Sequence, residues 1–188
     1  MLRFILLLLV SVSLLLPASA LAQPECNGIE FACQLNDLGS NTYEYVFTLT
    51  NNSTTSIAIF KWGITNPQIP SSWQTVGWDL PTGWNGKHPG QHIDFMSTDN
   101  GDANPNRLYS PSALSCGPGT NVYVFKWTFV NNGGPTPVCD FVTEDFKIHY
   151  QPVNASTCNN VGPSLLCPGP LPVEAKTWGL IKELFRTL

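Results

Sequence analysis

The sequence predicts an all-β domain, an antiparallel β-sandwich of immunoglobulin-like or jelly-roll-like type, followed by a short C-terminal amphipathic helix. Three observations lead to this prediction: an apolar N-terminal leader, short segments in which apolar residues alternate with period two, and an even number of cysteines. Alternation is typical of strands that bury one face. Six or seven such strands separated by Gly, Pro and Asn turns favour two packed sheets. A single sheet closed on itself is the main alternative.

The first element is the leader, in which Arg3 precedes the run FILLLLVSVSLLL and the small-residue stretch ASALA. Two serines and Pro17 interrupt a run that would need about 20 apolar residues to span a membrane. The pattern therefore predicts a signal peptide over residues 1–22, with Gln23 as the first residue of the exported chain. A retained membrane anchor is the alternative.

The strands are predicted over residues 23–167, which we take as one β-sandwich domain. Alternating apolar residues occur in GIEFACQL, YEYVFTL, IAIFKWGI, HIDF, VYVFKWTFV and DFKIHY. No stretch of ten residues between 25 and 167 has a helical period. At this length a domain buries roughly 68–70% of its unfolded surface, which is enough for a hydrophobic core.

The composition changes after Cys167. The sequence PGPLP predicts a stiff linker over residues 168–173. In the last segment, 174–188, apolar residues fall on one stripe of a helix, with charged residues elsewhere. This stripe contains Trp178, Ile181, Leu184, Phe185 and Leu188. A helix of about fourteen residues is marginal alone in water, so we expect it to dock on its own domain, a membrane surface or a partner protein.

Charged residues are sparse. Without Arg3 the exported chain has eight Lys and Arg against thirteen Asp and Glu, a net charge of −5. Nucleic acid is an unsuitable partner because phosphate binding requires clustered basic residues. No transmembrane segment is predicted in the exported chain, so we expect it to be secreted or to reside in the cell envelope or periplasm.

All cysteines lie in the exported part. They are Cys26, Cys33, Cys116, Cys139, Cys158 and Cys167. An even number in an exported chain favours disulfides, and the absence of C-x-x-C argues against a zinc knuckle or thioredoxin-like site. Six cysteines allow 15 pairings; we expect the local pairs Cys26 with Cys33 and Cys158 with Cys167, and a Cys116–Cys139 bridge between two strands.

Two tryptophans are candidates for ligand binding. Trp62, Trp84 and Trp127 belong to apolar strands or a strand start and are predicted to be core. Trp73 and Trp78, with Asp79 beside them, lie in PSSWQTVGWDLP, which has polar and turn residues and no alternating apolar face. An exposed pair of rings could bind a sugar, whereas packing of this loop on its own sheet is the alternative.

Metal and calcium sites are weaker candidates. In KHPGQHIDF the Pro-Gly turn excludes the helical spacing of a zinc site for His88, His92 and Asp94. In STDNGDANPNR the oxygen-bearing residues are Asp99, Asp102, Asn104 and Asn106. This segment departs from an EF-hand because it lacks the required Gly and the closing Glu. We predict no metal site and no cofactor, with a structural calcium ion as the alternative to an Asx-rich turn.

No catalytic motif is present. The sequence has no G-x-S-x-G and no cysteine with an evident base. The acidic group Asp140, Glu144 and Asp145 is explained by solvated strand edges. The protein is therefore expected not to be an enzyme, and a secreted hydrolase is the least favoured alternative.

Several motifs resemble a known family. They are Y-x-Y-x-F-x-L-x-N-N-S, the turn PTGW, IDF and C-G-P-G-T-x-V-Y-V-F, which together span most of residues 41–130. They look like the secreted bacterial β-sandwich modules found on sorting-tagged exoproteins. The chain departs from tagged versions because it lacks Pro-Glu-Pro followed by a membrane helix. The resemblance implies a non-catalytic module with a structural or interaction role toward a cell-surface protein or glycan.

The end of the chain, Trp-Gly-x-Ile-Lys-x-Leu-Phe-Arg, also resembles a short C-terminal tail of secreted bacterial proteins. This resemblance implies an address or docking tag. Packing of the same helix on its own domain remains the alternative.

Overall fold

A computed structural model describes residues 26–66, 69–98, 105–141 and 145–168. The predicted signal peptide, the C-terminal helix with Trp178, Ile181, Leu184 and Phe185, and the linker beyond Pro168 lie outside these residues. Asp99, Asp102 and Asn104 lie outside them as well. No helix within the described ranges is long and apolar enough to cross a membrane.

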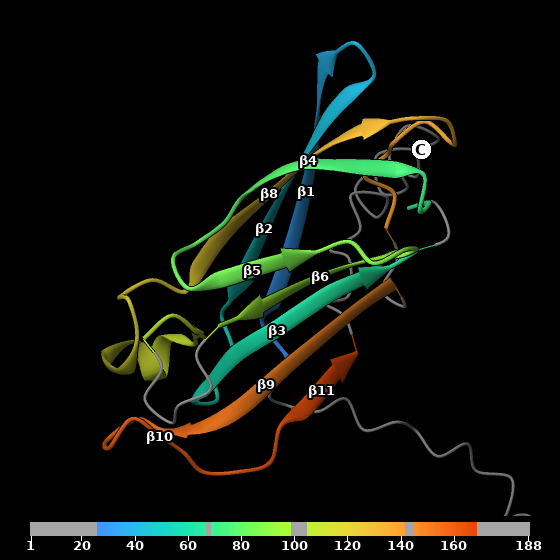
Figure 1. Ribbon diagram of the computed structural model, residues 1–188. Helices are drawn as coiled ribbons and strands as arrows, with labels where there is room; N and C mark the ends of the chain where they lie inside the picture. The colour runs from blue at the N-terminus through green and yellow to red at the C-terminus, as the bar shows by residue number, and fades with distance from the viewer. Residues whose placement is uncertain (1–25, 67–68, 99–104, 142–144, 169–188) are drawn as a thin grey trace, which may run out of the picture.

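The described chain forms two antiparallel sheets (Figure 1). The four-stranded sheet has the order β1-β2-β8-β4, and the seven-stranded sheet the order β10-β9-β3-β6-β5, with β11 paired to β9 and β7 to β3. The strands are β1 Ile29–Gly39, β2 Thr42–Asn51, β3 Ile57–Thr65, β4 Trp73–Asp79, β5 Trp84–Lys87, β6 His92–Ser97, β7 Leu108–Tyr109, β8 Val122–Asn131, β9 Phe146–Asn154, β10 Asn159–Asn160 and β11 Leu165–Pro168. The prediction of an antiparallel all-β architecture is confirmed.

Aromatic side chains from both sheets fill the core. Successive side chains of a strand point to opposite faces of its sheet. Every second residue of β8 is therefore buried, namely Phe125, Trp127 and Phe129, and Phe47 of β2 is buried for the same reason. Trp62 of β3 contacts β8 across the interface, with ring centroids 5.0 Å from Phe125. The inner faces of the two sheets therefore interdigitate, and the predicted core positions of Trp62, Trp84 and Trp127 are confirmed.

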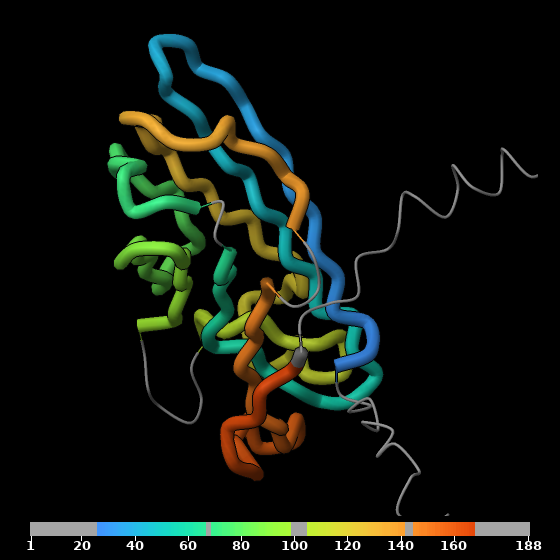
Figure 2. Tube along the Cα trace, turned by 90° about the vertical axis from the view of Figure 1, so that its right-hand side faces the viewer, coloured from blue at the N-terminus to red at the C-terminus, as the bar shows by residue number. Residues whose placement is uncertain are grey.

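A second, smaller cluster covers one end of the outer face of the seven-stranded sheet. A 3₁₀ helix, Pro111–Cys116, follows β7, and its Ala113 packs with Ala58, Tyr109 and Val153. The segment is fixed to the sheet because the Ile57 amide donates to Ser110 Oγ. The rest of this outer face has no such cover among the described residues. Figure 2 shows the chain from the side, with the hairpin of β1 and β2 in blue at one end and the turn after β9 in red at the other.

Three disulfides join distant parts of the chain: Cys26–Cys167, Cys33–Cys139 and Cys116–Cys158. The expected pairings are wrong. Cys33 lies in β1, and because an extended strand rises about 3.3 Å per residue, the segment from Ile29 to Cys33 carries Cys33 about 13 Å away from the start of the strand near Cys26. This path disfavours the roughly 4.4–6.8 Å between Cα atoms that a disulfide requires. Three disulfides suggest an oxidising environment, extracellular or periplasmic.

Candidate functional site

Two rows of side chains stand on the uncovered outer face of the seven-stranded sheet. Strand register places Lys147, Gly63, Asp94 and Lys87 in one line across β9, β3, β6 and β5. The adjacent line runs Leu166, His149, Lys61, Met96 and Asn85. We call the first line the lysine row and the two lines together the open face.

Period two explains why these residues point outward. On β9, Phe146, Ile148 and Tyr150 are buried, so Lys147 and His149 between them lie on the opposite face. On β6, Phe95 is buried and its neighbour Asp94 is outward. The apolar core thus fixes the position of each polar side chain on the open face.

Gly63 has no side chain at the centre of the lysine row. The Asp94 carboxylate occupies the space above it, since a β-carbon at position 63 would be 2.5 Å from Asp94 Oδ1. Lys61 Nζ lies 3.4 Å from Asp94 Oδ2, and His92 Nε2 lies 3.8 Å from the same oxygen. A small cavity opens here, lined by Lys61, Asn85, Lys87, Asp94 and Met96.

His149 lies between two lysines of the open face. Burial lowers the pKa of its imidazole, and the positive charges of Lys61 and Lys147 lower the pKa further, against an opposing effect of Asp94. The ring is therefore neutral at pH 7. It also contacts Phe60, with centroids 6.1 Å apart.

Arg107 lies at the end of the open face that is nearest to the smaller cluster. Its guanidinium lies 5.5 Å from the centroid of the Phe60 ring. Its Nη1 donates to Gln151 Oε1 at 2.6 Å and to Asn160 Oδ1 at 2.9 Å. Arg107 is thus held in place as a structural part of this end.

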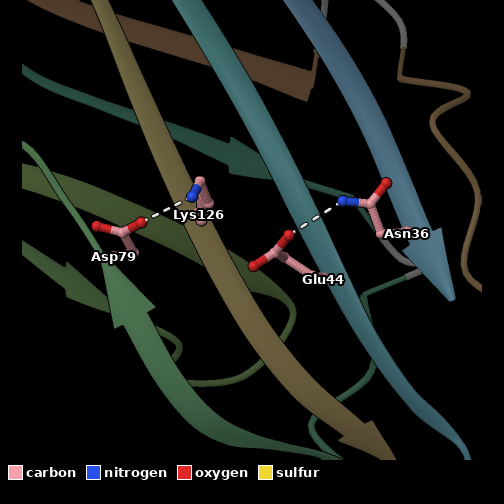
Figure 3. Close-up of polar contacts among 4 residues, drawn as sticks. All are labelled: Asn36, Glu44, Asp79 and Lys126. Carbon is pink, nitrogen blue, oxygen red and sulfur yellow. Dashed lines mark hydrogen bonds and ion pairs between the residues drawn. The ribbon is translucent and has the colours of Figure 1, made fainter. Parts of the chain in front are cut away.

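The lysines of the open face are less neutralised than the lysine of the other sheet. In the described part of the chain, neither Lys87 nor Lys147 makes an ion pair. On the four-stranded sheet, Lys126 Nζ lies 2.8 Å from Asp79 Oδ2, and Asn36 donates to Glu44 at 3.0 Å (Figure 3). Two exposed ammonium groups of the lysine row are therefore available to an external anion.

The predicted tryptophan site does not form an exposed pair. Trp73 is 2% exposed and stacks on Phe129, with centroids 4.6 Å apart. Trp78 is half-buried against Trp127, and its ring lies over Gly86 of the facing sheet. The Asp79 carboxylate accepts a hydrogen bond from Lys126 Nζ. Both rings are engaged in the core because large apolar surfaces are most stable there.

The histidines near the Pro-Gly turn point to different places. His88 packs against the buried ring of Trp127, with centroids 4.7 Å apart, whereas His92 lies beside the open face, with its Nε2 3.8 Å from Asp94 Oδ2. Burial lowers the pKa of His88, a hydrogen bond with the Gly90 backbone opposes this, and the charge of His92 adds to it. Among the residues that the structure describes, no three His, Cys, Asp or Glu side chains converge as metal ligands.

The structure describes two of the three residues of the acidic group, Asp140 and Asp145. Asp145 is buried and accepts a hydrogen bond from Asn66 Nδ2 at 2.7 Å. Asp140 is exposed, and Glu144 lies outside the described residues. Asp145 therefore serves as a buried acceptor between two loops, rather than as the solvated edge residue expected from the sequence.

Comparison with known proteins adds no relative: a scan of protein-family models finds no match to this chain, and a search of curated proteins finds no similar sequence.

Sequence reasoning missed the open face. Each of its lysines is isolated in the sequence, separated from the next by 26 residues or more. The alternation in β3 and β9 could have indicated that Lys61 and Lys147 point outward. Their shared row could not be inferred, because it depends on the order in which distant strands pair.

Proposed function

We propose that this protein is an exported, non-catalytic interaction module that acts outside the cell or in its envelope. The oxidising environment suggested by three disulfides supports this location, and the apolar leader over residues 1–22 supports export. We further propose that the two sheets form a β-sandwich of the type found in secreted bacterial modules.

The observation that supports an interaction role most directly is the open face itself. It spans strands β11, β9, β3, β6 and β5, and its polar side chains stand on strands whose inner faces are buried. The buried inner faces fix the backbone of these strands, so the spacing between the polar residues is set before a partner arrives. A surface of this kind suits a partner larger than a small molecule.

The C-terminal segment is proposed to dock or sort the protein. Its amphipathic pattern, with Trp178, Ile181, Leu184 and Phe185 on one stripe, supports contact with another surface. This role is separate from that of the open face and requires its own test, namely localisation of the protein when these four residues are replaced by Ser.

The interaction role is tested by incubating the purified exported chain with intact cells of the organism that produces it. We expect saturable sedimentation with the cells and no turnover of glycoside, ester or peptide substrates. Absence of saturable binding would contradict the interaction role. Turnover that survives further purification would favour the hydrolase alternative.

A further inference from the structure

Charge is segregated between the two sheets. Of the described lysines, Lys61, Lys87 and Lys147 lie on the open face, and Lys126 lies on the four-stranded sheet. The outer face of the four-stranded sheet also has three carboxylates, from Glu30, Glu44 and Asp79. The open face is therefore cationic although the chain as a whole is anionic.

The net negative charge does not prevent the open face from attracting an anion. Packed sheets lie about 10 Å apart, and outward side chains add to this separation. The Debye length is about 8 Å at physiological ionic strength. Through solvent, the carboxylates of the four-stranded sheet are thus largely screened from a ligand on the open face.

The spacing of the lysines favours an extended anion over a small one. Lys147 and Lys87 stand on β9 and β5, three strand spacings apart, which corresponds to roughly 14 Å between their backbones. When their side chains extend away from the sheet, the two ammonium groups stand too far apart to share one phosphate or carboxylate. A linear polymer with repeated negative charges can contact both while crossing the centre of the row, where Asp94 lies above Gly63.

The Asp94 carboxylate at the centre of the lysine row favours an acidic polymer with hydroxyl groups over an acidic peptide. Asp94 lies there with its carboxylate between the two outer lysines, and it accepts hydrogen bonds but donates none. A peptide of Asp and Glu would bring more carboxylates to this point. A uronic-acid polymer has hydroxyl groups that can donate to Asp94 and carboxylates that can contact the lysines.

The remaining side chains of the cavity suit the same ligand. Asn85 offers an amide donor and acceptor, and Met96, which is 40% exposed, offers an apolar surface for sugar C–H groups. Few precisely placed polar groups beside an apolar surface are a common arrangement in ligand sites.

From this geometry we propose that the open face binds a linear acidic polysaccharide, with Lys87 and Lys147 contacting its carboxylates and Asp94 accepting from its hydroxyls. This inference deepens the proposed function and depends on it. It does not involve Trp73 or Trp78.

The test uses isothermal titration of the exported chain with sodium polygalacturonate and with alginate at physiological ionic strength. Lys87→Gln and Lys147→Gln each remove one charge from the lysine row. Lys126→Gln removes one from the four-stranded sheet and is the matched control. We expect each of the first two changes to weaken binding roughly tenfold, because a charge-assisted hydrogen bond contributes about that factor. The control should bind like the wild type.

Neutral dextran and poly-L-glutamate complete the experiment. Dextran should not bind, and binding of the uronates should weaken as salt rises. No binding of either uronate, or equal loss in all three variants, overturns the proposal. Tighter binding of poly-L-glutamate than of the uronates overturns the assignment to a polysaccharide in favour of an acidic peptide. If the uronates fail but the protein still sediments saturably with cells, the interaction role stands and only the ligand is wrong.

Discussion

The carboxylate of Asp94 lies directly over the backbone of Gly63 in the neighbouring strand. A β-carbon at position 63 would be 2.5 Å from Asp94 Oδ1 and 2.6 Å from the Ile93 carbonyl oxygen. The first neighbour is the end of a side chain and can move, but the second is backbone within the β3–β6 ladder. Glycine at this position is therefore a condition for the close pairing at the centre of the open face.

Replacing Gly63 by Ala should destabilise the protein. Relief of the contact requires a shift of the β6 backbone, and we expect the free energy of unfolding to fall by about 1–3 kcal/mol. Urea denaturation followed by tryptophan fluorescence measures this change.

Gly77→Ala is the matched control, because no atom lies within 4 Å of a β-carbon at position 77. It should change the free energy of unfolding by no more than about 0.5 kcal/mol. Equal denaturation midpoints for the two variants would contradict the close packing at Gly63.

The disulfides should differ in their contribution to stability. Cys26–Cys167 joins residues 141 apart in the sequence, and Cys116–Cys158 joins residues 42 apart. The chain-entropy model gives about 5 kcal/mol for the longer loop and about 4 kcal/mol for the shorter. We expect Cys26→Ala/Cys167→Ala to lower the melting temperature more than Cys116→Ala/Cys158→Ala. The reverse order would show that strain or cavity effects outweigh loop entropy.

Connectivity itself can be checked by proteolysis without reduction. Mass spectrometry should find the Cys33 peptide linked to the Cys139 peptide. A Cys26–Cys33 link, as local reasoning suggested, would contradict the pairing of the structure and the extended path of β1 up to Cys33.

Alternation in the sequence was enough to locate β2, β8 and β9, since burial of every second residue is a local property of a strand. It failed for β4. Trp73 and Trp78 are five residues apart, so unbroken alternation would place them on opposite faces. A register shift between Thr75 and Gly77 inserts one residue, Val76, and turns both tryptophans toward the core.

The features that the sequence did not predict depend on pairing between strands that are distant in the chain. The disulfides and the lysine row bring together residues from strands whose order in the sheets is not their order in the chain. Lys87 and Lys147, for example, share a row only because β6 and β3 lie between their strands. A single sequence has no local signal for that order.

The tryptophans provide a direct test of how the core is built. Oxidative footprinting should find Trp62, Trp73, Trp84 and Trp127 protected, because each is no more than 5% exposed. Trp78 is half-buried and should react at an intermediate rate. Rapid oxidation of Trp73 would contradict its stacking on Phe129 and would restore it as a candidate ligand platform. Trp73→Ala should cost about 3–5 kcal/mol of stability.

Acid should weaken the fold through His88. Burial against Trp127 lowers the pKa of His88 below its usual value of about 6.5. Between that value and the lower pKa of the folded state, the unfolded chain binds a proton that the folded chain does not, so stability falls as the pH falls through this window. His149 acts in the same direction because its pKa is also lowered.

We therefore expect the melting temperature of His88→Gln to fall less than that of the wild type when the pH is reduced from 7.5 to 5.0. Glutamine cannot take up the proton, so the part of the acid sensitivity due to position 88 disappears. Parallel melting profiles for His88→Gln and the wild type would show that His88 is solvated when protonated. The contact with Trp127 would then open at low cost in acid.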